Sequence, residues 1–516
     1  MLHNYRKLAA LGAALLLAGC HTAEKQHSPP AAPAAQAPSA IRVPHLFSDN
    51  MILQRGAAVP IWGWGQEGAT VTVKFRGQTV SARVKEGKWI AWLHNLKAGG
   101  PATLTISAGI PLEFTNVLVG DVWLAGGQSN MEFPLRNSFE AAGDVAAAAN
   151  PMIRLLRVPH TRLDEPTNDI RASWMECKPE TAANISAVAY YFARDLQGKL
   201  GVPIGILESD WGGTTAEAWM ERGFLKANPD YEIDILEEWP LQQEKYQRSL
   251  AAFEAERRQA AENNPATNRT APRRPWKPAE LYNGMIAPLV PFAIKGVLWY
   301  QGESNADSPD RATQYRKLFP DLIRDWRSVW GEGDFPFLLV QLAPYMQIQP
   351  QPGESAWALL REAQLLATQT LPNVGMAVIT DVGEERDIHP KKKKPVGQRL
   401  ALAARAIAYH EPVEYLGPTP KSMRRVGDEI ILTFDHVAGG LEARGGEPKG
   451  FAIAGADGKF VWGTAEIQGL DRVAVRSAEV PHPVAVRYGW ANYPVVNLCN
   501  KAGLPASPFR TDDFPK

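Results

Sequence analysis

The chain has 516 residues, too many for one hydrophobic core and suggestive of about three domains. Its 45% apolar and 21% charged residues are typical of globular proteins and exclude wholesale disorder. Basic and acidic residues balance at 55 each, which excludes the positive excess expected of a nucleic acid-binding protein. Three cysteines cannot build a disulfide framework, and no Cys/His cluster has metal-ligand spacing, so we expect no metal.

Residues 1–20 resemble the signal peptide of a bacterial lipoprotein. Two basic residues precede an apolar stretch at 8–18 that is too short to span a bilayer. The stretch ends in Leu-Ala-Gly-Cys20, which resembles a lipobox whose cysteine becomes lipidated. Residues 21–40 are rich in Ala and Pro and are expected to form an extended linker. His21 in place of Asp then favours the outer membrane of the cell envelope, facing the periplasm or cell surface. An ordinary signal peptide with an accidental cysteine is the alternative.

Residues 41–119 have the texture of a small β domain. Alternating runs at 71–76 and 79–84 lie among turns that contain glycine, which is typical of a β-sandwich. Residues 413–516 return to β texture, at 429–434 and 483–488 for example. We expect a second accessory sheet there, or a completion of the first.

Residues 120–412 alternate between strands and helices, which predicts a parallel sheet covered on both faces. The expected strands are 117–124, 203–207, 294–300, 337–342 and 374–380, and the expected helices are 188–200 and 396–409. A charged insertion at 226–280 interrupts this order, and we expect it to be helical up to about Asn263 and then Pro- and Arg-rich. A surface excursion that forms a lid or wall of a cleft is one interpretation, and disorder at 262–276 is the alternative. The lysine run 391–394 is expected to be a solvated helix start.

Three motifs follow strands of this sheet, where ligands bind in open α/β folds. The first, Gly-Gln-Ser-Asn-Met, places Ser129 between a strand and a helix as a candidate nucleophile, although an N-cap serine in a tight turn is the simpler alternative. The second, Trp-Gly-Gly-Thr, contains Gly213, whose backbone N–H suits an oxyanion. The third, Gln301-Gly-Glu303-Ser-Asn305, offers amide donors, with Glu303 expected to accept hydrogen bonds within the loop.

A fourth segment supplies a base and an acid. Asp387 and His389 lie two residues apart in the loop before the last core helix. In an extended loop, side chains at i and i+2 point the same way, so the carboxylate could meet the imidazole. A base oriented by a carboxylate is the arrangement that activates a serine.

Together the four motifs, in this order, resemble the SGNH hydrolase superfamily and within it the sialate O-acetylesterases, from about residue 47 to the C-terminus. The resemblance implies a flavodoxin-like α/β/α core with accessory β-sandwich regions. It implies Ser129 as nucleophile, His389 as base and Gly213 as oxyanion glycine. Gln301 and Asn305 fall in the block that usually supplies an amide donor, and Gln128 and Glu303 are grouped with them as oxyanion or substrate-binding residues.

The chain departs from the superfamily pattern at the acid. The pattern is Asp-x-x-His, but Arg386 stands three residues before His389 and Asp387 stands at minus two. We favour Asp387 as the orienting acid. The alternatives are Asp381, Glu384, Glu385 or a Ser–His dyad.

The resemblance implies a serine O-acetylesterase that deacetylates carbohydrate through an acetyl-enzyme without a cofactor. O-acetylated sialic acid is the favoured substrate, and its carboxylate calls for a cation, for which Arg136 and Arg386 are candidates near the motifs. Acetylated xylan or xyloglucan is the alternative, as is a noncatalytic surface lipoprotein that binds glycans. Membrane contact is expected through the lipid anchor only, and no nucleic acid partner is expected. The sequence does not define the oligomeric state. An oxidising compartment allows a disulfide between Cys177 and Cys499, but their positions in the sequence do not show whether they pair.

Overall fold

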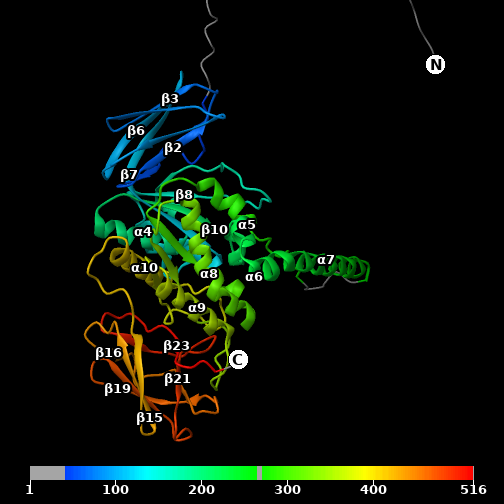
Figure 1. Cartoon of the computed structure of the whole chain (residues 1–516), viewed down its shortest axis with the longest axis vertical. Helices are drawn as coiled ribbons and strands as arrows, with labels where there is room; N and C mark the ends of the chain where they lie inside the picture. The colour runs from blue at the N-terminus through cyan, green and yellow to red at the C-terminus, as the bar shows by residue number, and fades with distance from the viewer. Residues whose placement is uncertain (1–40, 264–269, 515–516) are drawn as a thin grey trace, which may run out of the picture.

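The computed structural model describes residues 41–263 and 270–514. Residues 1–40, for which a signal peptide ending at Cys20 and a linker were expected, lie outside these described residues, as does part of the Pro- and Arg-rich stretch. The described chain forms three tiers along its long axis, with a β region, an α/β layer and a second β region in chain order (Figure 1). Among the described residues, no helix has the length and apolar character needed to cross a membrane.

The first tier contains short strands that pair antiparallel, except β1, which pairs in parallel with β7. These are β1 (Ile52–Gln54), β2 (Val59–Trp64), β3 (Thr70–Phe75), β4 (Gln78–Arg83), β5 (Lys88–Leu93) and β6 (Gly99–Ser107). Strand β3 pairs with β4 and β6, and β2 pairs with β5. Strand β7 (Pro111–Gly127) pairs with β6 in its first half and continues into the second tier, so one strand joins the two.

The second tier is built on one sheet with the order β13-β12-β11-β7-β10-β8-β9. Its other strands are β8 (Asn150–Arg157), β9 (Met175–Cys177), β10 (Ile204–Asp210), β11 (Gly296–Tyr300), β12 (Phe337–Val340) and β13 (Val374–Ala377). Every neighbouring pair is parallel except β8 and β9. The carboxyl ends of β7, β10, β11 and β13 therefore lie at one edge, where the four sequence motifs begin.

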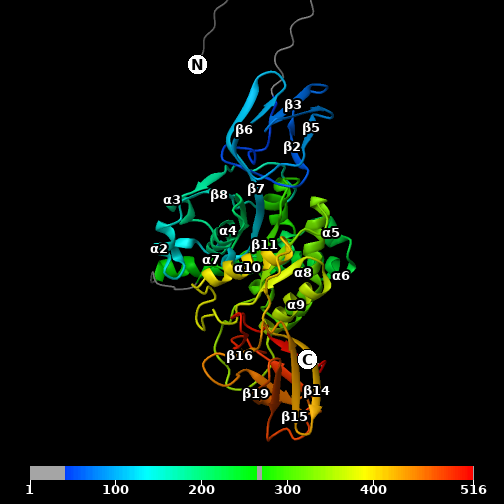
Figure 2. The ribbon, with the colours of Figure 1, turned by 90° about the vertical axis from the view of Figure 1, so that its left-hand side faces the viewer.

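Helices cover both faces of this sheet. Helices α4 (Ala187–Leu200) and α10 (Lys394–Ile407) lie on one face, and α8 (Pro309–Trp330) and α9 (Ala356–Thr370) on the other (Figures 1 and 2). Successive residues of β7 pack on opposite faces of the sheet: Trp123 packs on the side of α4 and α10, and Leu124 packs on the side of α8 and α9. The strands are buried on both faces, and the expected three-layer α/β/α core is confirmed.

Capping residues explain where these helices begin and end. Ser186 and Ser308 accept N–H hydrogen bonds at the starts of α4 and α8, and Ser355 does so for α9. Gly201 and Gly331 end α4 and α8 in the left-handed conformation that glycine tolerates. Shorter helices are α2 (Ala141–Ala146), α3 (Pro179–Ala182), α5 (Arg222–Lys226) and α6 (Pro229–Tyr231).

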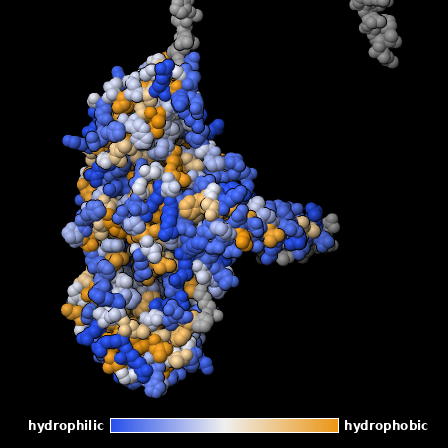
Figure 3. Space-filling model, in the orientation of Figure 1, coloured by the Kyte–Doolittle hydropathy of each residue, from blue (hydrophilic) through white to orange (hydrophobic). Residues whose placement is uncertain are grey.

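The insertion expected at 226–280 contains one long helix. After a π-helical segment (Glu232–Glu237), α7 (Glu238–Asn263) projects sideways from the second tier (Figure 1). Its surface is mainly hydrophilic on the face shown in Figure 3. Residues 270–279 then return along the core, where the Trp276 indole N–H donates to the Gly213 carbonyl at 2.6 Å.

The third tier has its own small core. One sheet contains β14 (Thr419–Val426), β15 (Glu429–Asp435), β20 (Arg472–Arg476) and β19 (Thr464–Gln468), and another contains β18 (Val461–Trp462), β17 (Phe451–Ala454), β21 (Ala485–Tyr488) and β23 (Phe509–Arg510). Strands β16 (Leu441–Ala443) and β22 (Leu498–Asn500) pair separately. Ile430, Ile453 and Phe509 are among the residues that these strands bury together. Cys177 in β9 and Cys499 in β22 are buried and both free, so the disulfide that the sequence allowed is not formed.

Candidate active site

Ser129 lies directly after β7, in a turn that requires glycine. Gly127 has a φ of +138°, and a Cβ atom there would lie 2.2 Å from the Tyr300 carbonyl oxygen. This close approach of β7 and β11 turns the chain sharply into α1 (Ser129–Glu132). The serine thus begins a helix at the carboxyl edge of the sheet, as its motif predicts.

His389 meets Ser129 across 260 residues of sequence. Its Nε2 atom lies 2.8 Å from the Ser129 Oγ, which is hydrogen-bond distance. The loop that carries His389 runs from β13 to α10 along the same sheet edge. A neutral imidazole with a free Nε2 lone pair accepts the serine hydroxyl proton in this geometry.

Asp387 is the carboxylate beside His389. Its Oδ1 accepts the His389 backbone N–H at 2.9 Å and lies 3.6 Å from Nδ1. The other three acids considered from the sequence have partners elsewhere: Asp381 pairs with Arg399, Glu384 accepts the Lys391 N–H and Glu385 accepts the Ile348 N–H. The geometry therefore favours Asp387, although its contact with the ring is longer than a good hydrogen bond.

The surroundings favour the uncharged form of His389. Burial lowers the pKa of its imidazole, and the nearby Lys393 ammonium lowers it further. Asp387 acts in the opposite direction, and the pKa remains below the ordinary 6.5. At neutral pH the ring is thus available to accept a proton.

Two backbone N–H groups near the nucleophile are candidate donors to an oxyanion. The Ser129 N–H, at the first position of α1, and the Gly213 N–H find no acceptor among the described residues. Gly213 has a φ of +75°, which glycine adopts readily. Its neighbour Gly212 packs against the nucleophile, since a Cβ there would lie 3.1 Å from the Ser129 Cβ, but its N–H donates to the Glu132 Oε2 at 2.8 Å.

The two candidate side-chain donors of the third motif are occupied elsewhere. Gln301 is fully buried and donates to the Thr214 carbonyl and the Asn305 Oδ1 at 3.0 and 2.7 Å. Asn305 is also fully buried and donates to Glu217 at 3.1 Å. The assignment of Gln301 as the oxyanion donor is therefore wrong in this structure: both amides shape the loop that supports the glycine motif.

Gln128 and Glu303 are buried and hold the motifs together. The Gln128 Oε1 accepts the backbone N–H groups of Gly302 and Ser304. The Glu303 Oε1 accepts the Asn130 side-chain N–H at 2.6 Å, which fits the expected structural acceptor. The contacts of both side chains join the first motif to the third, and neither lines the cavity next to Ser129.

A cavity of about 380 Å³ opens next to Ser129 and His389. Its lining includes Glu132, Arg136 and Arg157. Of the two arginines suggested by the sequence, Arg136 reaches the cavity, whereas Arg386 is exposed and does not line it. Arg157 is a cation that the sequence analysis missed, because it lies outside the motifs at the end of β8.

A second group of titratable residues adjoins this cavity through Glu132. Glu132, His160 and Asp210 have potential ligand atoms within 4.8 Å of one another, and of the described residues they alone could jointly hold a cation. Burial raises the pKa of the neighbouring Glu208 to about 7 and that of Asp210 well above its usual range. The His160 Nε2–H donates to the Asp210 carbonyl at 2.9 Å, and its ring stacks on Trp211. Trp211 is the first residue of the second motif and Asp210 directly precedes it.

Comparison with known proteins agrees with this geometry. Residues 266–406 match the carbohydrate esterase family described as sialic acid-specific acetylesterase. The chain is 32% identical to the sialate O-acetylesterase of Mus musculus, over 90% of this chain and 93% of the relative, and 30% identical to that of Homo sapiens, over 91% and 92%. A solved structure of a carbohydrate acetylesterase from Xanthomonas citri matches with 41% identity and a TM-score of 0.79, over 92% of this chain and all of the other. The chain belongs to the sialate O-acetylesterase family of carbohydrate esterases.

Proposed function

We propose that the protein is a serine O-acetylesterase that removes acetyl groups from carbohydrate through an acetyl-enzyme on Ser129. The observation that carries this proposal is the 2.8 Å contact between the Ser129 Oγ and the His389 Nε2 at the floor of an open cavity. His389 takes the hydroxyl proton as the serine oxygen attacks the acetyl carbonyl carbon.

The tetrahedral intermediate carries its negative charge on the former carbonyl oxygen. The free N–H groups of Ser129 and Gly213 are its proposed donors, and loss of one such donor typically lowers turnover by about 10²–10³. The imidazolium then protonates the departing sugar oxygen. Water, deprotonated by His389, attacks the acetyl-enzyme and releases acetate, so every step uses groups of the chain itself.

O-acetylated sialic acid is the proposed substrate. A sialic acid carries a carboxylate, which requires a cation near the acetyl group. Arg136 and Arg157 line the cavity that contains Ser129 and supply that charge. Arg157 also lies 3.4 Å from Glu208, so Arg136 is the cation with less carboxylate competition.

Acetylated hemicellulose is the second candidate substrate. The Xanthomonas citri relative, at 41% identity, is named a carbohydrate acetylesterase, a broader description than sialate O-acetylesterase. A neutral xylan or xyloglucan would make no use of a carboxylate-binding arginine. The Arg136→Gln variant therefore separates the two: it raises KM for a sialate ester and leaves hemicellulose unchanged.

Acetate release from a substrate panel tests the proposal. The panel contains 9-O-acetyl sialic acid, acetylated xylan, acetylated xyloglucan and a nitrophenyl acetate control. We expect the wild type to release acetate most efficiently from the sialate, and Ser129→Ala to release none from any substrate. A folded Ser129→Ala protein with retained activity contradicts the mechanism, and a preference for hemicellulose contradicts the substrate.

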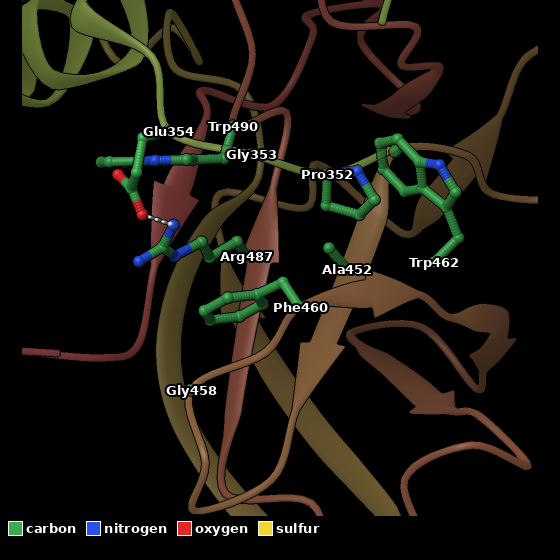
Figure 4. A pocket seen from close by; sticks show the side chains of 10 residues that line it. Pro352, Gly353, Glu354, Ala452, Gly458, Phe460, Trp462, Arg487 and Trp490 are labelled. Carbon is green, nitrogen blue, oxygen red and sulfur yellow. Dashed lines mark hydrogen bonds and ion pairs between the residues drawn. The ribbon is translucent and has the colours of Figure 1, made fainter. Parts of the chain in front are cut away.

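A noncatalytic glycan-binding protein was an alternative from the sequence, and membership of an esterase family sets it aside. The third tier nevertheless has a pocket that favours glycan binding as an additional role. Phe460, Trp462 and Trp490 line a cavity of about 190 Å³ against the loop at Glu354 (Figure 4). Aromatic rings offer flat apolar faces, and the Arg487–Glu354 pair at 2.7 Å offers polar groups beside them.

Binding measurements separate this role from catalysis. Ser129→Ala should retain binding to an acetylated glycan, and Trp462→Ala should weaken it without affecting hydrolysis of nitrophenyl acetate. Met423→Ala, another exposed apolar residue of the same tier, is the matched control. Equal binding by Trp462→Ala and the control would eliminate the pocket as a glycan site.

A lipid anchor at Cys20 is the proposed attachment to the cell envelope. Its support is the lipobox-like sequence Leu-Ala-Gly-Cys and the Ala- and Pro-rich stretch that follows. An enzyme held there by its N-terminus would meet acetylated glycans outside the cytoplasm.

A further inference from the structure

One lysine of the run 391–394 is fully buried. The structure confirms the expected helix start, since α10 begins at Lys394, but corrects the expectation that the whole run is solvated. Lys391, Lys392 and Lys394 are exposed, whereas Lys393 is 0% exposed. A buried ammonium group is costly unless it is paired, so its surroundings need an explanation.

The Lys393 side chain reaches the residue next to the nucleophile. Its Nζ donates to the Asn130 Oδ1 at 2.5 Å. The Asn130 Nδ2 in turn donates to the Glu303 Oε1 at 2.6 Å and to the Ile388 carbonyl at 2.9 Å. Through Asn130, three segments are tied together: the Ser129 turn, the third motif and the His389 loop.

Charged and aromatic groups from every neighbouring element face this ammonium. Glu303 faces it from the loop after β11, and Glu384, Asp387 and His389 face it from the loop before α10. The rings of Phe133 and Tyr300 have their centroids 4.9 and 5.3 Å from Nζ. Glu303 is itself buried, and its Oε2 has no hydrogen-bond partner among the described residues.

We propose that Lys393 is a positioning residue of the esterase, whose buried ammonium group fixes Asn130 beside Ser129 and sets a positive charge next to the His389 imidazole. The inference rests on the proposed roles of Ser129 and His389. It gives the fourth motif a function beyond its histidine, and it explains why one lysine of the run is buried beneath the site.

The positive charge acts on the pH at which His389 becomes a base. Burial lowers the pKa of Lys393 to about 7, so the ammonium is charged below that pH. The pKa of His389 is also lowered, so the imidazole gains its proton on the acidic side, where Lys393 is charged. Repulsion between the two cations disfavours the imidazolium, and removal of the lysine charge therefore raises the pKa of His389.

The pH profile of kcat/KM for nitrophenyl acetate tests this role. In Lys393→Met, the acidic limb should move up by about 0.5–1 pH unit because the cation is lost. Its kcat should fall by about tenfold or more because Asn130 is released. Lys393→Gln keeps an N–H donor without the charge, so its limb should move similarly with a smaller loss of kcat. Lys391→Met, an exposed neighbour, should match the wild type in both.

The results separate this inference from the proposed function. An unmoved acidic limb in a folded Lys393 variant overturns the role of Lys393, while an inactive Ser129→Ala leaves the esterase mechanism standing. Activity retained in Ser129→Ala overturns the mechanism itself.

Discussion

Asp387 contacts His389 in two ways of unequal strength. It accepts the backbone N–H at 2.9 Å, but its carboxylate lies 3.6 Å from Nδ1 and its side chain is 44% exposed. Water competes for an exposed carboxylate and screens its charge. The backbone contact holds the loop, while the longer contact orients the ring only weakly.

His389 and Asp387 should therefore differ in their importance. We expect His389→Ala to cost nearly as much activity as loss of Ser129, because the two groups act as a unit. Asp387→Asn should cost less, though still about 10²-fold or more, through a poorer tautomer and a less stable imidazolium. Steady-state kinetics on nitrophenyl acetate measure both. Glu385→Gln, whose carboxylate binds the Ile348 N–H instead, is the matched control.

A near-wild-type Asp387→Asn enzyme would indicate that the imidazole needs no carboxylate. A near-wild-type His389→Ala enzyme would overturn the mechanism.

The sequence predicted the roles of single residues where these residues stand in short, distinctive motifs. Ser129 and His389 could be predicted because each stands in a distinctive sequence at a strand end. The sequence could not predict roles for three other residues near the site: Lys393, Glu132 and Arg157. They stand in a lysine run, a helix and a strand, where such residues are usually solvated or structural, and only the fold brings them to the site. The amide of Gln301 suggested a donor, but only the structure shows that its N–H groups are already bound.

At the scale of elements, hydrophobic pattern located the core strands and helices and missed some ends. The run expected at 117–124 belongs to a strand of 17 residues, β7, which extends in both directions. Its first half alternates between half-buried and exposed residues in the first tier, and its second half is buried on both faces. The pattern of burial therefore changes within β7, and a search for hydrophobic periodicity divides this one strand into two segments.

Helix α8 carries a buried acid that makes stability depend on pH. Burial raises the pKa of Asp325 to about 7, while its Oδ2 accepts the Glu221 N–H at 2.7 Å. The folded state then holds a proton that the unfolded chain releases above a pKa of about 3.9. Stability contributed by this group is thus full at low pH and is lost as pH rises toward 7.

Asp325→Asn should be more stable than the wild type at pH 8, by about 1–2 kcal/mol, because its amide keeps an acceptor and removes the charge. The advantage of the variant should be smaller at pH 5, because Asp325 is still protonated in the folded state there. Urea unfolding at both pH values measures the difference, with the exposed Asp513→Asn as control. A variant that is less stable than the wild type at pH 8 would contradict a raised Asp325 pKa.

At the scale of the whole molecule, the change from β to α/β to β texture could be read from the sequence. The joints between the tiers could not, because they depend on long-range contacts. Arg361 in α9 is fully buried and donates to the carbonyls of Ala491 and Asn492 at 2.7 and 2.9 Å. The Tyr493 hydroxyl donates to the Gly383 carbonyl in the loop that leads to His389. The third tier thus contacts both α9 and the loop that precedes His389.

Attachment to the envelope belongs to the same scale. Cys20→Ser should move the protein from the membrane fraction to the soluble fraction, because a lipid-modified cysteine is the only anchor proposed. Fractionation followed by mass spectrometry of the N-terminus measures both location and modification. A wild type that is already soluble, with an unmodified N-terminus, would reject the anchor.

Labelling with a fluorophosphonate followed by peptide mapping tests whether Ser129 is a nucleophile activated by His389. The reagent phosphonylates a serine only where a base activates it, and the neutral His389 at 2.8 Å provides that activation at Ser129. We expect one adduct per chain, on the peptide that contains Ser129, with loss of labelling in Ser129→Ala and His389→Ala. An adduct on another residue, or acetate release that survives complete labelling, would contradict it.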